Sequence, residues 1–590
     1  MAALDPDLEL MLHYEPPETR VRLMIEWAGN EPDLVAKGVS LLAPIEDGTA
    51  LAEVTLTTVA KMRGDAEIGY IELLPVFGQE LNVSRTVINA PAKLIGGGYN
   101  GPSGKGVTIG IVEYDFDVFH RSLRNTDGSS RFLWLWDMNA SGKTAKIDDL
   151  KAPEGFGTGV LYSKADIDLA LSKPAAGEDK KTTKRRQKLF GNLMMLRGGG
   201  HGTGVASIAA GSGRLSTGAD SGNLGIAPEA DLVGVAVRSL HDWATGLRFL
   251  RKKLQGKPSV MNLSAGEHHG PHLPGGRVEK WFEALIDKSG IALVKSAGNG
   301  GGLGGHATGT VKKNTTATLQ LQMTSNAAQL KKRIRVQIWY GYGGASPKLG
   351  ATITPPGGAT AYDIPYDGIC TAPPSQIRAS NRKRPDQLGL SAIVLWLKPS
   401  VGLWTIRLRA PEDKDVKWHA WISWGASRTR TVRFTGNSVV SDASSITVPA
   451  AVPNMVTVAS FITKDQTGNS TPDHKIAPSS ARGPAADGVA AAITIAAPGE
   501  YIRAATPPDP LAHGQPPGTT DRYELLAGTS FAAPHVTGAI ALMLEKNPNL
   551  KPSQIVSILR TDNPSEKLDK NSWGSGRLDI ARLLSLVPSP

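Results

Sequence analysis

Residues 528–536 read Gly-Thr-Ser-Phe-Ala-Ala-Pro-His-Val and begin an apolar stretch that predicts a helix over 530–546. The small residues beside Ser530 allow its backbone to approach another segment closely. A helix N-terminus supplies unpaired N–H groups and a positive dipole end, and both favour a developing oxyanion. The segment therefore predicts a nucleophilic serine, and the structural alternative is that Ser530 only caps the helix.

Nearly continuous apolar runs alternate with helical stretches in the chain before this segment. Such runs are typical of parallel strands that are buried on both faces. Their alternation with helices predicts an α/β fold, with a parallel sheet and helices on both of its faces. The predicted strands are 107–112, 231–237, 259–263 and 291–294, and the predicted helices include 204–210 and 277–288.

Six further short segments accompany the serine segment in a defined order along the chain. They are Gly110–His120, His201-Gly202-Thr203, Val260–Gly266, Ser296-Ala297-Gly298-Asn299, Ser479–Pro484 and Ala497-Pro498-Gly499. In this order the segments resemble the motifs of the subtilisin-like (S8) serine peptidases. The resemblance covers residues 100–137, 198–306 and 440–584, and it implies a subtilisin-like sheet.

The resemblance implies a serine endopeptidase that hydrolyses peptide bonds of protein substrates through an acyl-enzyme. Ser530 would be the nucleophile, and His201 would take its proton and later donate it to the leaving amine. The side-chain amide of Asn299 would donate to the tetrahedral oxyanion, together with the backbone N–H of Ser530.

The acidic segment departs from the family's pattern. The family has Asp at the end of the first strand, whereas Glu113 holds this position here, in a register that the spacing to His120 supports. We expect Glu113 to orient the imidazole of His201. Two alternatives stay open: Asp115 serves as the acid, or the triad is impaired. An impaired triad would make the chain a regulatory or binding module on a subtilase scaffold. A further alternative is a protease that is kept latent until a partner activates it.

The resemblance also implies two substrate-binding segments. One is an edge strand that pairs with an extended peptide, and the other is a wall of the pocket for the side chain before the cleaved bond. The strand consists of Leu263, Ser264, Ala265 and Gly266, and the wall of Ser296, Ala297 and Gly298. The small residues of the wall predict an open pocket.

Neither a metal nor a cofactor is expected from the sequence. Glu267, His268, His269 and His272 lie close together in the chain, but their spacing matches no standard zinc pattern. We expect a solvated loop on the substrate side there. No acidic loop has EF-hand-like spacing, and calcium binding is left open.

The charge of the chain is concentrated in one segment. The 590 residues include 65 Lys+Arg and 54 Asp+Glu, which gives a net charge of +11. Residues 307–437 alone hold 19 basic and 6 acidic residues, so the remaining chain is close to neutral. One hypothesis is that this segment recruits an acidic partner or substrate. The alternative is a solvated β-module that supports the fold. A nucleic-acid partner is not expected, because no known binding signature is present.

Short alternating runs separated by Gly/Pro turns predict that the basic segment is a β-sandwich. The pattern of residues 1–80 predicts a small α+β domain. It lies where the family carries its propeptide, and a plain accessory domain is the alternative. The predicted boundaries are 1–80 for the propeptide-like domain, 81–105 for a connector, 106–306 for the first catalytic part with a basic loop insertion at 138–197, 307–437 for the inserted β-sandwich and 438–590 for the second catalytic part.

A cytoplasmic location is expected from three features. Cys370 is the single cysteine, so the chain can form no internal disulfide. No apolar run is long enough for a transmembrane helix, and the first residues lack the pattern of a secretory signal.

Overall fold

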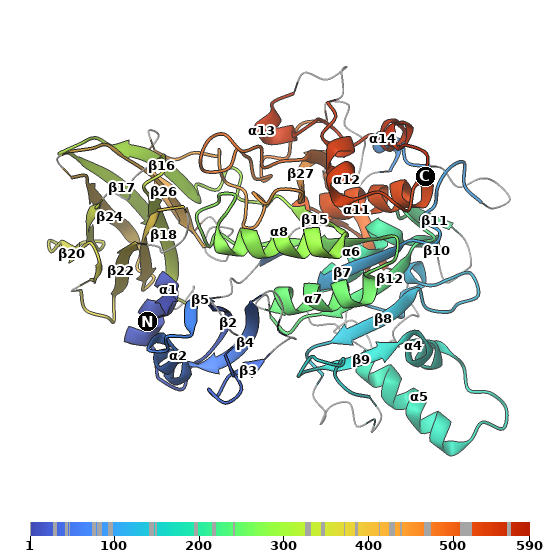
Figure 1. Cartoon of the computed structure of the whole chain (residues 1–590). Helices are drawn as coiled ribbons and strands as arrows, with labels where there is room; N and C mark the ends of the chain where they lie inside the picture. The colour runs from blue at the N-terminus through green and yellow to red at the C-terminus, as the bar shows by residue number, and fades with distance from the viewer. Residues whose placement is uncertain are drawn as a thin grey trace.

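The computed structural model contains three parts: an N-terminal α+β domain, a large α/β domain and a β-sandwich inserted into the α/β domain (Figure 1). No described helix is long and apolar enough to cross a membrane. The structure describes residues 2–590 apart from 28–31, 42–44, 46–47, 74–77, 80–84, 92–97, 141–146, 148–149, 194–198, 215–219, 240–241, 325–331, 344–347, 371, 384–387, 412, 424–430, 437–438, 465–473, 508–521 and 563–567.

An eight-stranded sheet forms the centre of the α/β domain, in the order β28-β27-β15-β13-β7-β12-β8-β9. All neighbours are parallel except β8 and β9. Every residue of β7 and β13 is buried, as the continuous apolar runs predict. The strands are β7 (Thr108–Glu113), β8 (Phe132–Asp137), β9 (Val160–Ser163), β12 (Asp231–Ala236), β13 (Ser259–Leu263), β15 (Ala292–Ser296), β27 (Val456–Ile462) and β28 (Ile495–Glu500).

Helices cover both faces of this sheet, which confirms the predicted fold class. One face packs against α6 (His201–Ala210), α11 (Thr529–Lys546), α12 (Pro552–Leu559) and α14 (Ile580–Leu586), and the other packs against α7 (Trp243–Leu254) and α8 (Arg277–Ser289). The helices α6 and α11 therefore share one face, and they contact each other. Smaller elements at the periphery are η1 (Thr86–Ile88), η2 (Arg121–Leu123), β10 (Ser212–Arg214), β11 (Asp220–Leu224), β29 (Ile502–Thr506), β30 (Arg522–Leu526) and α13 (Lys570–Trp573).

The prediction of a solvated basic loop over 138–197 is wrong for the residues that the structure describes there. The segment forms β9, α4 (Lys164–Leu171) and α5 (Lys180–Leu193). Arg186 on α5 is buried and forms an ion pair with Glu178, and Leu189 and Leu193 join the core. These three residues of α5 follow the helical period and so share one face. The density of positive charge obscured this pattern in the sequence.

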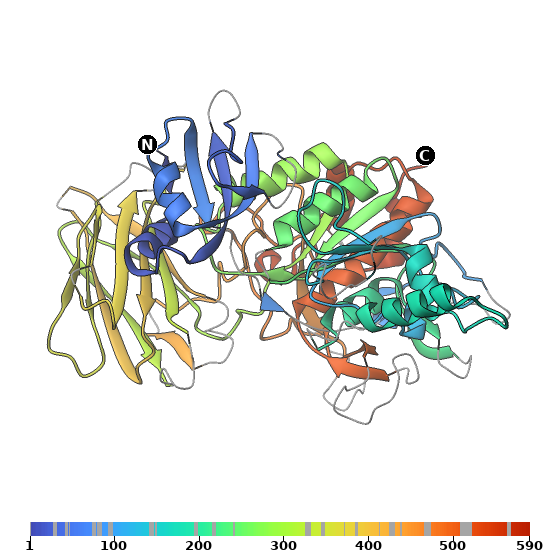
Figure 2. The ribbon, with the colours of Figure 1, turned by 90° about the horizontal axis from the view of Figure 1, so that it is seen from below.

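The N-terminal domain is a five-stranded sheet in the order β1-β5-β2-β4-β3, with two helices. Its elements are β1 (Ala3–Leu4), α1 (Pro6–Tyr14), β2 (Arg20–Trp27), β3 (Ser40–Leu41), β4 (Thr49–Thr55), α2 (Leu56–Arg63) and β5 (Ile68–Leu73). Figure 2 shows this domain between the β-sandwich and the α/β domain. It contacts both, because Glu9 pairs with Arg382 of the sandwich at 2.6 Å and Glu26 pairs with Arg277 of α8.

The inserted domain consists of two antiparallel sheets packed face to face around their own apolar core. The sheet orders are β16-β25-β18-β23-β22-β21 and β20-β19-β24-β17-β26. The strands are β16 (His306–Val311), β17 (Thr316–Met323), β18 (Ile334–Tyr340), β19 (Gly350–Thr354), β20 (Tyr362–Ile364), β21 (Gly368–Ile369), β22 (Ile377–Lys383), β23 (Ser391–Leu397), β24 (Gly402–Arg409), β25 (Val416–Ile422) and β26 (Val432–Thr435).

Stacked aromatic rings join the β-sandwich to the α/β domain. The ring of His272 lies 4.0 Å from that of Trp421, with an angle of 7° between the two planes. His306 lies 5.0 Å from the same tryptophan, and its Nε2 atom is 3.0 Å from Nδ1 of His419. His268 stacks on the far side of His272 at 5.3 Å. We call these rings the histidine row.

The prediction of a solvated loop at 267–272 is therefore wrong. His268, His269 and His272 are each at most 3% exposed, and Glu267 is 5% exposed. The segment is polar, so its sequence favours solvent. The residues that bury it come from β16, β18 and β25, more than thirty positions away in the chain.

Burial keeps the histidine row neutral. It lowers the pKa of His306 to about 4, that of His268 to about 3 and that of His419 to about 2, and it lowers the pKa of His272 well below its ordinary value. Because an exposed histidine titrates near pH 6.5, the unfolded chain binds more protons than the folded chain below that pH. The row stabilises the fold fully above pH 6.5, and its contribution is lost as the pH falls from 6.5 towards 4.

We expect the unfolding temperature, measured by calorimetry, to fall as the pH drops from 6.5 to 4. Each neutral histidine contributes a slope of up to about 1.4 kcal/mol per pH unit. His306→Gln should make the fall shallower, whereas the exposed His13, changed to Gln, serves as the matched control. Equal slopes for the wild type and both variants would contradict this assignment.

Candidate active site

Glu113 and His201 meet where the first central strand ends and a helix begins. Glu113 is the last residue of β7, and His201 is the first residue of α6. The Oε2 atom of Glu113 lies 2.9 Å from Nδ1 of His201, and both side chains are buried. A Cβ atom at Gly202 would lie 2.8 Å from that of Glu113. Only glycine at 202 lets the helix begin so close to the strand.

Asp115, the alternative acid, occupies a different place. Its Oδ2 atom accepts a hydrogen bond from the backbone N–H of Gly200 at 3.3 Å, just before α6 begins. Gly200 adopts a φ of 84°, in the region that favours glycine. The geometry thus places Asp115 at the backbone in front of α6, and Glu113 at the imidazole of His201.

Ser530 lies in the first turn of α11, beside the start of α6. The helix cap is Gly528 and not Ser530, so the interpretation of Ser530 as a simple cap is wrong. The Oγ atom of Ser530 donates to the carbonyl oxygen of Ser264 at 3.0 Å. The ring of Phe531, the next residue, lies 5.2 Å from the ring of His201. The two helix starts therefore bring Ser530 and His201 to the same edge of the sheet.

A chain of hydrogen bonds fixes the backbone at Ser530. Thr537, two turns further along α11, donates to Oδ1 of Asn262 at 2.8 Å. The amide of Asn262 donates to Oγ of Ser264 at 2.9 Å, and that hydroxyl donates to the carbonyl oxygen of Ser530 at 2.7 Å. The sequence indicated Asn262 and Ser264 as motif residues but gave no reason to select Thr537.

Asn299 lies beside the same helix start. Its Oδ1 atom accepts from the backbone N–H of Thr529 at 3.0 Å. The hydroxyl of Thr529 accepts from the backbone N–H of Gly298 at 3.1 Å. Because the oxygen of the Asn299 amide is the acceptor in this contact, its NH₂ end supplies the donors.

The predicted substrate strand pairs with the chain itself. Ala265 and Gly266 form β14, which is antiparallel to β6 (Gly78–Gln79) at the end of the N-terminal domain. Gln79 is the partner of Ala265, and Gly78 is the partner of Gly266. A short backbone segment that precedes the connector therefore lies where an extended peptide substrate is expected.

The open pocket that the small residues suggest stays a prediction. Thr447 lies between the two segments predicted as its walls. Its side chain packs against Gly266, and its methyl group would lie 2.9 Å from a Cβ atom at Gly298. The buried ammonium of Lys295 donates to Oγ1 of Thr447 at 2.7 Å and to the carbonyl oxygen of Ser296. A charged residue within the apolar run at 291–296 of the sequence could have pointed to Lys295. No feature of the sequence pointed to Thr447, which follows the insertion.

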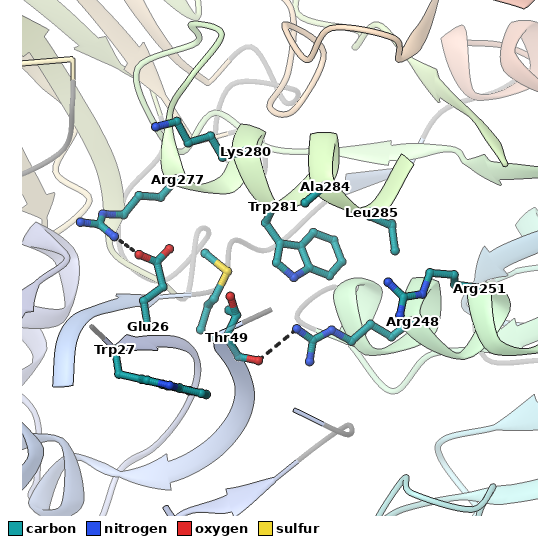
Figure 3. A pocket seen from close by; sticks show the side chains of 12 residues that line it. Glu26, Trp27, Thr49, Arg248, Arg251, Arg277, Lys280, Trp281, Ala284 and Leu285 are labelled. Atoms are coloured by element: carbon teal, nitrogen blue, oxygen red, sulfur yellow. Dashed lines mark hydrogen bonds and ion pairs between the residues drawn. The ribbon is translucent and has the colours of Figure 1, made fainter. Parts of the chain in front are cut away.

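A separate cavity of about 290 Å³ lies between the N-terminal domain and the helices α7 and α8. Figure 3 shows Arg277 reaching Glu26, and Arg248 reaching the backbone at Thr49. The second of these contacts measures 3.3 Å. The cavity is lined by strands of the N-terminal domain on one side and by Trp281 and its neighbours on the other. It belongs to the seam between the two domains.

Comparison with known proteins identifies a family. Residues 104–337 and 409–576 match the profile of the subtilase family. Fervidolysin from Fervidobacterium pennivorans is 33% identical over 178 residues, which are 26% of this chain and 22% of that protein. Subtilisin-like protease SBT3 from Solanum lycopersicum is 37% identical over 154 residues, 22% of this chain and 20% of that protein. The matched part thus spans about a fifth of the length of these relatives.

The fold is also shared with a solved structure. The CspB protease of Clostridium perfringens aligns with 82% of this chain and 94% of its own, with a TM-score of 0.61 and 20% sequence identity. At this identity the likeness concerns the fold alone.

A matched pair of isosteric variants distinguishes the two carboxylates. We expect Glu113→Gln to lower kcat/KM for a peptide substrate by roughly 10⁴-fold, because the amide cannot stabilise the charged imidazole. Asp115→Asn should stay within about tenfold of the wild type, since it changes a contact to the backbone. The reverse order of the two losses would assign the acid to Asp115.

Proposed function

The chain belongs to the subtilase family, and we propose that it is a serine endopeptidase that cleaves protein substrates through an acyl-enzyme. The observation that carries this proposal is the Glu113–His201 pair at the start of α6, beside Ser530 at the start of α11. In this assignment Ser530 is the nucleophile, His201 the general base and Glu113 the orienting acid.

The first step requires the hydroxyl of Ser530 to leave its resting partner. It donates to the carbonyl oxygen of Ser264 here, and this hydrogen bond must break before the hydroxyl can donate to His201. His201 then takes the proton as Oγ attacks the scissile carbonyl carbon, and it returns that proton to the leaving amine. Glu113 accepts from Nδ1–H and stabilises the charged ring while it holds the proton.

The developing oxyanion receives its donors from two elements. The NH₂ end of Asn299 is one donor, because its oxygen is engaged at Thr529. The backbone N–H of Ser530 is the other, in the first turn of α11 where N–H groups lack helical partners. Loss of one such donor costs roughly 10²–10³-fold in rate in enzymes of this type.

The N-terminal domain keeps the enzyme latent in this proposal. Its β6 segment pairs with β14, and substrate cannot use this strand at the same time. The domain is also held at two other places, by the Arg277–Glu26 pair at α8 and by Arg382–Glu9 and Arg378–Glu15 at the β-sandwich. Two arginines of the basic insertion, Arg378 and Arg382, already pair with acidic residues of this chain. An external acidic partner for the insertion stays a prediction.

The pairing of β6 supports a cleavage site shortly after Gln79. Gln79 pairs with Ala265, and Ser530 contacts the next residue along the opposite strand, Ser264. Glu80 and Leu81 follow Gln79 in the sequence, and we propose the Glu80–Leu81 bond as the bond that is cleaved. An acidic residue before the bond would suit Lys295, whose buried ammonium lies beside Gly266 and Ser296, two residues of the predicted substrate-binding segments.

Self-cleavage tests the proposed activity. We expect the purified wild type to convert into two fragments that remain one complex, with the cut after Glu80 located by mass spectrometry. Ser530→Ala should remain a single chain of full length, because it lacks the nucleophile. Identical behaviour of both proteins, with casein also uncut by both, would favour the non-catalytic binding module over the peptidase.

Peptide libraries test the assigned pocket. We expect a tenfold to hundredfold preference in kcat/KM for Glu over Leu before the cut, from charge-assisted hydrogen bonds worth about 1.5–3 kcal/mol. Lys295→Met should remove this preference while cleavage of neutral peptides persists. A wild-type preference for large apolar residues at this position would overturn the assignment.

A further inference from the structure

Three side chains of metal-ligand type meet where the N-terminal domain contacts the α/β domain. Asp5 precedes α1, Glu72 lies on β5, and His269 follows β14 by three residues. One ligand atom from each lies within 4.8 Å of the other two. The Nε2 atom of His269 is 3.4 Å from Oδ2 of Asp5 and 4.0 Å from Oε1 of Glu72.

The size of this triangle fits a small cation with nitrogen and oxygen ligands. Zinc binds such atoms at about 2.0–2.2 Å, so neighbouring ligands of a tetrahedral site lie about 3.4 Å apart. All three residues are at most 2% exposed. A divalent ion would balance the negative charge of two carboxylates that lie close together away from water.

We propose that Asp5, Glu72 and His269 form a binding site for a divalent transition-metal ion, with Zn²⁺ as the matching ion. Sequence spacing could not reveal it, because two ligands come from the N-terminal domain and the third lies about 200 positions later. The neighbouring histidines are not ligands, since His268 and His272 belong to the histidine row.

Gln337 of β18 sets the affinity of this site. Its Oε1 atom accepts from the backbone N–H of Gly270 and from Nε1 of Trp339, both at 3.0 Å, and its amide nitrogen therefore faces Nδ1 of His269 at 3.4 Å. A neutral imidazole that binds a metal through Nε2 carries its proton on Nδ1, where a hydrogen-bond acceptor strengthens binding. An amide nitrogen donates instead, so without a metal Nδ1 accepts and the proton lies on Nε2. Zinc must displace this proton, and we expect that to weaken binding.

A bound ion would link the N-terminal domain to the segment that follows the substrate strand. Glu72 lies on the strand that leads into β6, and His269 follows the β14 strand that pairs with β6. Metal binding should strengthen attachment of the N-terminal domain, and metal removal should weaken it. This consequence for activity rests on the proposed function, whereas metal binding itself does not.

Zinc binding is measured on the full-length Ser530→Ala chain, which cannot cleave itself. We expect one zinc ion per chain after dialysis against Zn²⁺, counted by elemental mass spectrometry, and no comparable binding of Ca²⁺. Asp5→Asn, Glu72→Gln and His269→Gln should each weaken zinc binding at least about 100-fold in competition with a chelating dye. His13→Gln, an exposed histidine on α1 of the same domain, is the matched control and should bind as the parent does.

Two further measurements keep the test decisive if a ligand variant fails to fold. Gln337→Glu supplies an acceptor to Nδ1 while keeping an oxygen for Gly270 and Trp339, and should tighten zinc binding about tenfold or more. Co²⁺ bound to the parent should give the visible absorption of a tetrahedral site, and added Zn²⁺ should abolish it.

The metal proposal is overturned if the parent binds no zinc, or if the three ligand variants bind it as the parent does. It is also overturned if Gln337→Glu leaves the affinity unchanged and Co²⁺ gives no tetrahedral spectrum. If only the peptidase proposal fails, the wild-type chain should bind stoichiometric zinc and never cleave itself. With both proposals correct, a chelator should speed dissociation of the cleaved N-terminal domain.

Discussion

The contact between the end of β7 and the start of α6 is the constraint on which the candidate site depends. It requires a glycine at 202, a buried strand end at Glu113 and a helix that begins at His201. The 2.9 Å pair between the two side chains fixes which imidazole nitrogen faces the strand. The other nitrogen is then available to the start of α11, where Ser530 lies.

Much of this arrangement could be predicted from the sequence. The strands at 107–112 and 259–263 are continuous apolar runs, and their composition alone indicates that they are buried. The motif residues follow from local order, and the choice of Glu113 over Asp115 agrees with the spacing to His120. The helix at 180–193 was missed, because its charge outweighed a helical pattern of three buried residues.

The remaining features depend on contacts between distant segments. The polar segment at 267–272 is buried only because the insertion supplies Trp421 and Gln337. Thr447 packs against Gly266 and Gly298 because the chain returns there after the β-sandwich. Some of the positive charges of the insertion likewise form ion pairs with acidic residues of the N-terminal domain. Neither composition nor periodicity carries such information, since each contact joins residues more than 60 positions apart.

These contacts give the three parts related roles. In the proposed function the α/β domain presents the reactive groups and the N-terminal domain occupies the substrate strand. The insertion contacts both through the histidine row and its ion pairs. The central claim, that Ser530 is an activated nucleophile, is tested most directly with a fluorophosphonate probe after the N-terminal domain has been removed. The account predicts one covalent adduct per chain, on the peptide that contains Ser530, and its loss on heat unfolding. A folded chain that forms no adduct, or forms one at another residue, would contradict it.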